Sequence, residues 1–315
     1  MKAWQFSEIG KAMTVVDIPE PKAGSGQVVI DVKAAGLCHS DVTLIDGQIT
    51  WMLAFSPIVL GHEVAGIISE VGEGVTGFAI GDRVGIAGAG LDAPGLTLDG
   101  GFAEKCVGKV EQLIHMPDGM PFIQAAAGVD AGMTSYHAVR VAGGVTKGTR
   151  VGIIGLGGLG MTGARIAVVA GAEVYAAEIN EAVWEKAMSM GVKGIVKDVL
   201  DLAQFNLDVI VDFAGFGTTT AGAVHSINPF GRIVQVGLSA TEITIESGPF
   251  VSKQLQLVGS LGAQKADAEN VYALIGNGDL EITATPISFD EIGEGIERLR
   301  RGGIQGRLVA MINPE

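Results

Sequence analysis

Two short motifs near the start of the chain contain the residue types that bind zinc. The run Leu37-Cys38-His39-Ser40-Asp41 is followed, about twenty residues later, by Gly61-His62-Glu63. A thiolate and an imidazole both suit zinc, and a catalytic zinc needs three protein ligands with one position left open. Cys38 and His62 would supply two of the ligands. Asp41 and Glu63 are candidates for the carboxylate that holds a ligating histidine in the right tautomer. Either ligand alone would more simply be a packed side chain, but the pair favours a metal site.

The segments around these motifs alternate short β-rich runs with turns. Residues 28–32, 63–71 and 82–86 are predicted strands, separated by glycine and proline. We therefore expect an irregular β-domain that carries the metal ligands on its loops. An apolar group between the two motifs is either core or one wall of an apolar substrate pocket; it consists of Leu44, Ile45, Trp51, Met52, Leu53 and Phe55.

A strand, a glycine-rich turn and a helix in the middle of the chain predict a dinucleotide site. Residues 149–154 form an apolar strand that leads into Gly155-Leu156-Gly157-Gly158-Leu159-Gly160, and residues 161–170 are predicted to be helical. The glycines permit a tight turn, close approach of a pyrophosphate to the backbone and close helix packing, and the helix N-terminus favours the phosphates. A second strand at 173–177 ends in Glu178, eighteen residues past Gly160. An acid at this place binds the ribose 2′-hydroxyl and repels a 2′-phosphate, so NAD is favoured over NADP.

The alternation of strands and helices continues beyond the turn. We predict strands at 208–213, 231–236 and 255–261 and helices at 124–141, 181–190 and 218–227, then helices at 266–275 and 290–301 and a last strand at 307–312. This pattern predicts an α/β protein in which residues 133–261 form a doubly wound parallel-sheet domain that binds NAD. Residues 1–132 and 262–315 would form the β-rich, zinc-binding catalytic domain.

The composition is that of a compact globular protein with room for two domains. Of 315 residues 48% are hydrophobic and 18% charged, and the formal net charge is -14. That charge argues against a surface that follows nucleic acid or an anionic membrane. Cys38 and Cys106 are the two cysteines, too few for a disulfide framework, and no run is long enough for a membrane span or a signal peptide core. We expect a cytoplasmic protein with no membrane or nucleic-acid partner.

Taken in order, the motifs resemble those of the zinc-dependent medium-chain alcohol dehydrogenase family. The matching segments cover nearly the whole chain: GLCHSD (36–41), GHEVAG (61–66), GDRV (81–84), AGMTSYHA (131–138), GLGGLG (155–160), FGRIVQVG (230–237) and GRLV (306–309). The resemblance implies a GroES-like catalytic domain, completed by the C-terminal segment, and a Rossmann domain. It also implies hydride transfer between NAD and an apolar primary or secondary alcohol or the corresponding aldehyde or ketone.

The same resemblance assigns roles around the metal. The third zinc ligand would be Asp130, where many members have cysteine and where some bacterial secondary-alcohol dehydrogenases look like this chain; aspartate is a legitimate zinc ligand. Glu63 would stand behind the metal as an occasional fourth ligand, and Asp41 would orient His62. Ser40 would hydrogen-bond the substrate oxygen and take its proton.

Further residues would contact the cofactor. By the resemblance, Gly155, Gly157, Leu159, Gly160 and Glu178 belong to the dinucleotide site, Thr134 would pack against the nicotinamide, Val236 would line the cofactor cleft, and His39 and Arg307 would meet the pyrophosphate. A guanidinium is permanently charged, which makes arginine the more attractive pyrophosphate contact. For the histidine, an exposed loop position is an equally good interpretation.

Two departures from the family pattern change the expectations. Members with a structural zinc carry a lobe with four close cysteines, but residues 85–98 contain none, so we expect one catalytic zinc per chain and no structural zinc. Cys106 is then most simply a packing residue. Thr43 stands where some relatives end a proton relay with histidine, and a threonine can pass a proton but cannot store it at neutral pH.

Two alternatives stay open from the sequence. One is a zinc-free NAD(P)H-dependent reductase of enones or quinones from the same superfamily; Cys38 and His62 tell against it, and the missing structural lobe favours it. The other is a non-catalytic NAD-binding protein, against which the complete ligand set argues. Relatives form dimers or tetramers, often through the last strand of the nucleotide-binding sheet, so residues 255–261 are the predicted edge of a homo-oligomer contact.

Overall fold

In the computed structural model of the protein, which describes residues 1–88 and 92–313, the chain forms two compact units. The first comprises Met1–Met133 and Gly262–Glu315, and the second comprises Thr134–Leu261. The chain therefore leaves the first unit after Met133 and returns to it at Gly262, so the C-terminal segment belongs with the N-terminal one. No helix among the described residues has the length and apolar character that crossing a bilayer requires.

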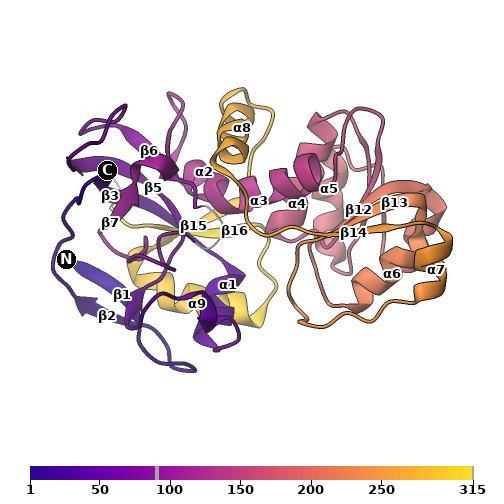
Figure 1. The fold of residues 1–315 in the computed structure, drawn as a ribbon, viewed down its shortest axis with the longest axis horizontal. Helices are drawn as coiled ribbons and strands as arrows, with labels where there is room; N and C mark the ends of the chain where they lie inside the picture. Colours follow the sequence, from indigo (N-terminus) through magenta and orange to yellow (C-terminus); the bar gives the residue numbers. More distant parts are fainter. Residues whose placement is uncertain (89–91, 314–315) are drawn as a thin grey trace. The chain divides into compact units, whose positions relative to one another are not determined.

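The first unit is built on a mixed sheet in which the C-terminal strand lies beside N-terminal ones. The strand order is β15 (Ala284–Ser288), β16 (Arg307–Met311), β3 (Gln27–Leu37), β5 (Glu63–Val71), β6 (Arg83–Ile86) and β8 (Leu113–His115), and β7 (Lys105–Lys109) also pairs with β3. Figure 1 shows β16 in yellow among the purple strands of the first hundred residues. The strands predicted at 28–32, 63–71, 82–86 and 307–312 are confirmed.

Smaller elements complete this unit. A second sheet runs β2 (Thr14–Asp17), β1 (Lys2–Phe6), β4 (Ile58–Val59), and short turns of 3₁₀ helix lie at Thr50–Met52, Val110–Gln112 and Phe289–Glu291. The helices of this unit include α1 (His39–Ile45), α8 (Lys265–Gly276) and α9 (Ile292–Arg301), and the helices predicted at 266–275 and 290–301 are thereby confirmed. Inward side chains of the strands form the core, among them Ile30, Leu37, Ile68, Ile86 and Leu113.

The apolar group between the two ligand motifs divides between core and surface. Leu44 and Ile45 are buried in the core, as the packing interpretation predicted, and Met52 and Leu53 pack against it in part. Trp51 is 69% exposed and Phe55 is 43% exposed. Burying such side chains would be favourable, so their exposure leaves apolar surface available for a ligand or another chain.

The helix predicted at 124–141 is present, but it is interrupted by wider turns. The segment runs as α2 (Phe122–Ala127), a π-helical turn η3 (Gly128–Gly132), α3 (Met133–Tyr136) and a second π-helical segment η4 (His137–Ala142). The glycines that weaken the helical pattern are the ends of η3, where a Cβ would lie 2.9 Å from the Tyr272 ring at Gly128 and 2.7 Å from Val271 at Gly132. Close packing against α8 therefore requires glycine at both places, and η3 is the turn that carries Asp130.

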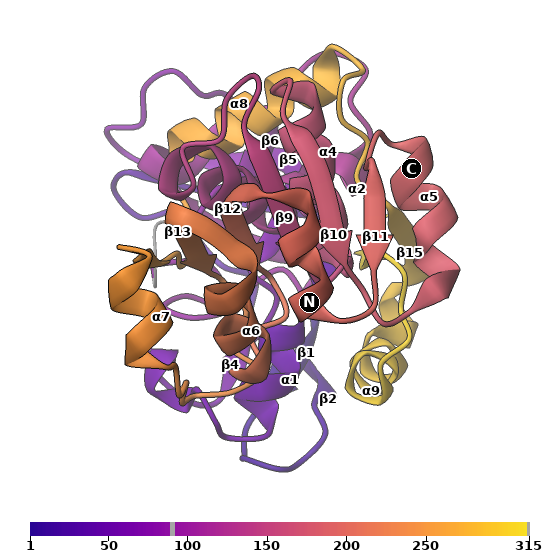
Figure 2. The ribbon, with the colours of Figure 1, turned by 90° about the vertical axis from the view of Figure 1, so that its right-hand side faces the viewer.

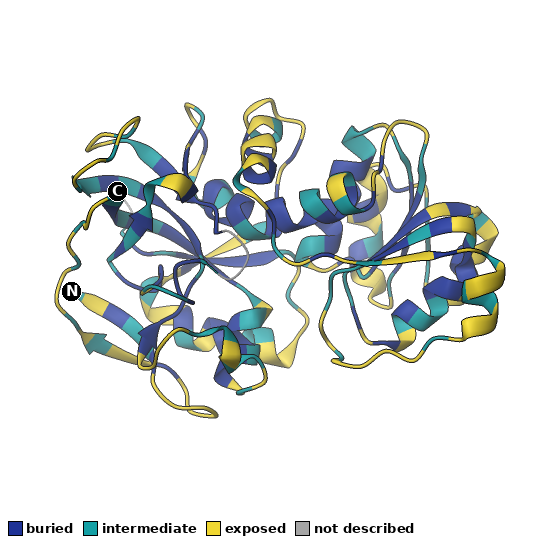
Figure 3. Ribbon diagram, viewed as in Figure 1, coloured by how far each residue is buried: buried dark blue, intermediate teal, exposed yellow. Residues whose placement is uncertain are grey.

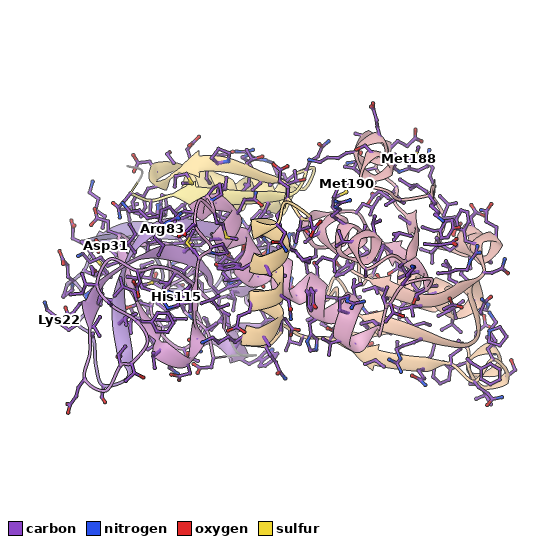
Figure 4. The ribbon with its side chains drawn as sticks, turned by 90° about the horizontal axis from the view of Figure 1, so that it is seen from above. Lys22, Asp31, Arg83, His115, Met188 and Met190 are labelled. Carbon is purple, nitrogen blue, oxygen red and sulfur yellow. The ribbon has the colours of Figure 1, made fainter. Side chains whose placement is uncertain are left out.

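Arg83 ties the start of this helix to the sheet. Its guanidinium carbon lies 4.6 Å from the centroid of the Phe122 ring, and its Nη2 donates to the carbonyl of Met120. Figure 4 labels Arg83 among the side chains of the β-rich unit. A cation over an aromatic face contributes about 0.5–2 kcal/mol, depending on exposure. This contact helps to hold α2, and therefore the η3 turn that follows it, against β6.

The second unit is a parallel sheet with helical connections. Its strand order is β11 (Gly194–Val196), β10 (Glu173–Ala177), β9 (Arg150–Ile154), β12 (Leu207–Asp212), β13 (Ile227–Gln235) and β14 (Gln256–Gly259), and every neighbouring pair is parallel. Figure 2 shows this order across the sheet from β11 to β13. The connections contain α4 (Gly158–Val169), α5 (Trp184–Ser189), α6 (Thr218–Ser226) and α7 (Ser247–Ser252), with 3₁₀ turns at Glu181–Val183 and Val199–Phe205.

This topology is the predicted doubly wound sheet, and the structure adds elements that the sequence pattern did not indicate: strand β11, the 3₁₀ turn at Val199–Phe205 and helix α7. The strands predicted at 149–154, 173–177 and 208–213 and the helices at 161–170, 181–190 and 218–227 are confirmed to within a few residues. β13 begins earlier than predicted, at Ile227, and β14 is shorter than the predicted run 255–261. The strands β9 and β12 are buried, whereas β14 is an exposed edge strand (Figure 3).

Candidate metal centre and dinucleotide turn

Donor side chains that are far apart in the sequence come together in the first unit. Cys38, His62, Glu63 and Asp130 each offer one ligand atom, and these atoms all lie within 4.8 Å of one another. Cys38 and His62 follow strands β3 and β4, Glu63 begins β5 and Asp130 lies in η3. The structure thus brings together the residues that the sequence suggested as ligands.

Cys38 is held by a short helix that starts directly after it. Its N–H donates to Asp41 Oδ2 at 2.9 Å, and the N–H of Asp41 donates to the Cys38 carbonyl at 3.1 Å. An aspartate in the first turn of a helix satisfies free backbone N–H groups and complements the helix dipole. The same turn places Ser40 Oγ 3.4 Å from His62 Nε2, so the hydroxyl lies beside the donor cluster.

The His62 imidazole lies between two carboxyl groups. Its Nδ1 is 3.5 Å from Asp41 Oδ1, and its Nε2 is 3.8 Å from Asp130 Oδ2. Because Nδ1 faces the fully buried Asp41, Nε2 is the nitrogen that faces the other donors. Asp41 therefore lies where a carboxylate that orients a ligating histidine would lie.

Arg307 brings a positive charge into the cluster. Its Nε lies 3.0 Å from Glu63 Oε2, its Nη2 lies 2.5 Å from Glu63 Oε1, and Nη2 also donates to Asp130 Oδ2. The residue is 5% exposed. Sequence reasoning missed this pairing; the available signal was a charged residue at the start of an apolar strand, which needs buried partners. Its contact with a pyrophosphate stays a prediction.

Burial and charge act in opposite directions on these groups. Burial alone would raise the pKa of the Cys38 thiol and of Asp130, but the positive charge of Arg307 together with the interactions with His62 more than offsets it, so both pKa values lie below the ordinary ones. Burial would lower the pKa of His62, and the Asp41 carboxylate raises it well above the usual value. Burial dominates for Glu63, whose pKa lies well above its usual range although Arg307 opposes the shift.

The donor set fits a zinc ion. One thiol with a lowered pKa, one imidazole whose Nε2 faces the other donors and one carboxylate form the mixed sulfur, nitrogen and oxygen set that zinc accepts. A second carboxylate, Glu63, stands within the same 4.8 Å. The anionic donors supply the negative charge that a divalent cation requires, and Arg307 balances part of it.

The glycine-rich turn of the second unit joins β9 to α4. Gly155 has a φ of +81°, which favours glycine, and a Cβ at Gly160 would lie 1.8 Å from the Gly155 carbonyl oxygen. Gly157 is the residue before α4 and has open space around its Cα, while the carbonyl of Leu159 accepts from Ser135 Oγ at 2.8 Å. The third glycine therefore permits the close approach of helix and strand, and the backbone of the second is accessible to a ligand.

Glu178 lies at this turn, at the end of β10. Its Oε2 accepts from the N–H of Leu156 at 2.6 Å, and its Oε1 accepts from the N–H of Asn180 at 2.7 Å. The carboxyl group is therefore fixed beside the glycine-rich turn by main-chain donors on both sides.

The other predicted cofactor residues are divided between the units. Thr134 is buried and Val236 is partly buried in the second unit, where the N–H of Val236 donates to the Asp212 carbonyl at 3.0 Å. His39 is exposed at the first position of α1, and it belongs with Arg307 to the first unit. Joint contact of these residues with one cofactor stays a prediction.

Comparison with known proteins identifies the family. Models of the alcohol dehydrogenase GroES-like domain and of the zinc-binding dehydrogenase domain match residues 24–118 and 158–277. The acryloyl-coenzyme A reductase of Sulfurisphaera tokodaii is 31% identical, over 93% of this chain and 94% of that protein. The chain belongs to the zinc-type medium-chain alcohol dehydrogenase family. An NAD-dependent alcohol dehydrogenase of the same organism is 28% identical, over 98% of this chain and 99% of that one.

A solved structure of this family agrees with the fold. The alcohol dehydrogenase of the archaeon Aeropyrum pernix superposes with a TM-score of 0.91 at 29% identity, over 99% of this chain and 100% of that one. The predicted family and the predicted fold class, a GroES-like domain with a Rossmann domain, are thereby confirmed.

Proposed function

We propose that this medium-chain alcohol dehydrogenase uses zinc and NAD to interconvert an apolar alcohol and its aldehyde or ketone. The observation that carries the proposal is the cluster of Cys38, His62, Glu63 and Asp130, whose donor atoms lie within 4.8 Å of one another. The relatives named as NAD-dependent alcohol dehydrogenases support the same activity.

In this proposal Cys38, His62 and Asp130 hold the zinc, and Glu63 stands beside it as an occasional fourth ligand. A zinc ion bound there supplies Lewis-acid polarisation of the alcohol or carbonyl oxygen. Asp41 holds the His62 ring by its Nδ1 side, and Ser40, whose hydroxyl lies 3.4 Å from His62 Nε2, takes the proton of the alcohol. A single zinc per chain is proposed because residues 85–98 contain no cysteine.

The cofactor proposal rests on the second unit. The N-terminus of α4 would face the pyrophosphate, with Gly155, Gly157, Leu159 and Gly160 around it. Glu178, held by the N–H groups of Leu156 and Asn180, would accept from the ribose hydroxyl and exclude a 2′-phosphate. Thr134 and Val236 would contact the nicotinamide, and His39 and Arg307 stay proposed contacts of the pyrophosphate.

We propose an apolar substrate because partly buried Met52 and Leu53 follow the metal motif in the chain, close to exposed Trp51 and Phe55. Turnover of a hydrophobic secondary alcohol should exceed that of sorbitol. Faster turnover of sorbitol would contradict this substrate class. A homo-oligomer joined through the exposed edge strand β14 is also proposed, and light scattering of the purified protein tests it.

One observation favours a second candidate, reduction of an activated carbon–carbon double bond. The 31% identical relative is named for acryloyl-coenzyme A, an α,β-unsaturated thioester. In that reaction hydride would go to the β-carbon instead of a carbonyl carbon. Comparing oxidation of NADH and NADPH by an acryloyl thioester and by a simple ketone separates the two candidates.

The decisive measurement is zinc per chain, by plasma mass spectrometry, in the parent and in Asp130→Ala. We expect about one zinc in the parent, weakened or lost in the variant, together with NADH formation from alcohols. A parent that stays free of zinc after reconstitution would contradict the proposal and would favour the zinc-free reductase.

A further inference from the structure

Asp212 is a fully buried acidic residue that the proposed site does not use. It is the last residue of β12, and none of its surface is exposed. Its Oδ1 accepts from the N–H groups of Ala214 at 3.0 Å and Gly215 at 2.8 Å. Its Oδ2 accepts from the hydroxyls of Thr219 at 2.7 Å and Thr220 at 2.8 Å. These bonds join the end of the strand to the loop 213–217 and to the first turn of α6.

The main chain of the same residue holds a second segment. The Asp212 carbonyl accepts from the N–H groups of Val236 and Gly237, each at 3.0 Å. Gln235 extends the network, because Thr220 Oγ1 lies 2.5 Å from its Oε1 and its Nε2 donates to the Gly237 carbonyl at 2.7 Å. Asp212 therefore connects the ends of β12 and β13.

The loop that Asp212 holds packs against the glycine-rich turn. A Cβ at Gly155 would lie 3.2 Å from the Ala214 Cβ and 3.4 Å from the Ala214 nitrogen, so the two segments are already in close contact. A Cβ at Gly215 would lie 2.0 Å from the Gly237 carbonyl oxygen. The turn, the loop 213–217 and the segment after β13 therefore fit together with little free space, and a shift of one displaces the others.

The strand order places these segments at the point where a ligand binds in such a sheet. From β9 the chain proceeds to β10 and β11 on one side, and β12, β13 and β14 lie on the other. Ligands of open parallel sheets bind at the carboxyl ends of the strands where the order reverses. That point lies between the turn after β9 and the loop after β12.

We propose that Asp212 is a positioning residue for the dinucleotide. Its hydrogen bonds hold the loop 213–217 and the Val236–Gly237 segment at the distance from the glycine-rich turn that NAD requires. The inference rests on the proposed function, since it assumes that this crevice binds NAD. Being fully buried, Asp212 acts through the main chain that it holds, and its loss affects cofactor affinity before it affects the metal centre. Burying a carboxyl group is costly unless hydrogen-bond donors surround it, and both side-chain oxygens of Asp212 have such donors.

The test compares NADH binding by the parent, Asp212→Ala and Asp208→Ala. Asp208 is the matched control: it lies on the same strand at the opposite end, is exposed, and accepts from the Arg150 N–H at 2.9 Å. Energy transfer from tryptophan to NADH gives the Kd, and Trp184, whose Nε1 donates to the Glu178 carbonyl at 3.1 Å, lies beside the proposed ribose site. Zinc per chain and the KM values for NAD and for alcohol are measured on the same samples.

We expect the NADH Kd of Asp212→Ala to be at least about tenfold weaker, and that of Asp208→Ala to stay within about twofold of the parent. The KM for NAD should rise while zinc content and the KM for alcohol stay unchanged. Asp212→Asn should recover most of the affinity, since its amide can keep the oxygen toward the main-chain donors and turn the NH₂ group to the threonine hydroxyls.

A folded Asp212→Ala that binds NADH like the parent would overturn the inference, as would an equal loss in Asp208→Ala. If Asp212→Ala does not fold, Thr219→Val decides. It removes one bond to Asp212 and the acceptor of the Phe216 N–H, and NADH affinity should still fall severalfold; unchanged affinity in Thr219→Val overturns the inference. A parent that binds neither NADH nor NADPH contradicts the proposed function itself, and this inference with it.

Discussion

Gly36 of β3 and Glu63 of β5 are paired across the sheet, and the Glu63 carboxyl group fills the space that a side chain at position 36 would need. A Cβ at Gly36 would lie 2.0 Å from Glu63 Oε2. Glu63 is fully buried and stands in the donor cluster with Cys38 and His62. Glu63 can therefore occupy its place on the neighbouring strand only because residue 36 is a glycine and has no side chain.

Gly36→Ala should displace Glu63 and lower both stability and zinc affinity. The overpacked methyl group should cost about 1–3 kcal/mol of unfolding free energy, measured by urea unfolding, and zinc affinity is measured by chelator competition. Gly259→Ala is the control, since it also lies in a strand but has open space around its Cα. Equal zinc affinity in Gly36→Ala and the parent would show that Glu63 does not matter for the metal.

Arg307→Met should destabilise the metal-free protein more than the zinc-loaded one. Removing the guanidinium takes the cation away from the buried Glu63 and the half-buried Asp130, which costs about 3–5 kcal/mol. Bound zinc would supply positive charge to the same carboxylates and reduce the loss. Urea unfolding with zinc and with a chelator measures the difference.

The exposed pair Arg301–Glu294 provides the comparison for Arg307. Arg301→Met should unfold like the parent in both conditions, because exposed ion pairs contribute little. A loss in Arg307→Met that is the same with and without zinc would contradict the electrostatic link between this arginine and the metal centre.

The two cysteines should differ in reactivity in metal-free protein. The pKa of Cys38 lies below the 9.0 of an ordinary thiol, because Arg307 and His62 together outweigh its burial, whereas burial raises the pKa of Cys106 to about 12. Since the thiolate is the reactive form, alkylation of Cys38 should rise with pH and level off below pH 9.0, while Cys106 stays unmodified.

Mass spectrometry after iodoacetamide treatment locates the modified cysteine. Cys106→Ala should keep the parent pH profile, and zinc should protect Cys38 in both proteins. Modification of Cys106 at pH 8 in folded protein would contradict its assignment to the core, where it is 1% exposed.

Ser40→Ala should reduce kcat by about 10²–10³-fold while zinc content stays at the parent value, because a general base contributes to the reaction and not to metal binding. Steady-state rates of alcohol oxidation and metal analysis measure the two effects. Thr43→Val tests whether the proton path continues from Ser40 to Thr43. The Thr43 hydroxyl donates to the His39 carbonyl at 3.0 Å. If the two variants lose equal activity, the proton path continues beyond Ser40.

Glu178→Ala should reduce kcat/KM for NAD by about tenfold, because the carboxylate accepts a hydrogen bond from the ribose. It should also narrow the preference for NAD over NADP, because the carboxylate repels a 2′-phosphate. Initial rates with the two cofactors measure the preference. Glu181→Ala removes an exposed carboxylate three residues further on, paired with Lys197, and should leave the preference unchanged. An unaltered preference in Glu178→Ala would assign cofactor choice to other residues.

Local pattern was enough for most elements of the parallel-sheet unit and for the ligand types, but it did not indicate α1, β11 or α7. The glycine-rich turn with Glu178 eighteen residues on, the apolar strands of the parallel sheet and the motifs around Cys38 and His62 depend on neighbours within a few residues. Periodicity and turn chemistry therefore predicted them. The π-helical turn η3 was not predictable in the same way, because its shape depends on packing of Gly128 and Gly132 against α8.

The sequence by itself determined that the chain is an α/β protein with zinc-ligand motifs and a dinucleotide turn, since residue type and spacing carry that information. Only the tertiary structure decided which charges meet. Arg307 reaches Glu63 across 244 residues and Asp130 across 177, and Asp212, part of a strand that looked merely apolar, joins a loop, a helix start and the next strand. Such contacts depend on strand order and register, and buried charges are satisfied by whatever partners the packed chain brings within reach.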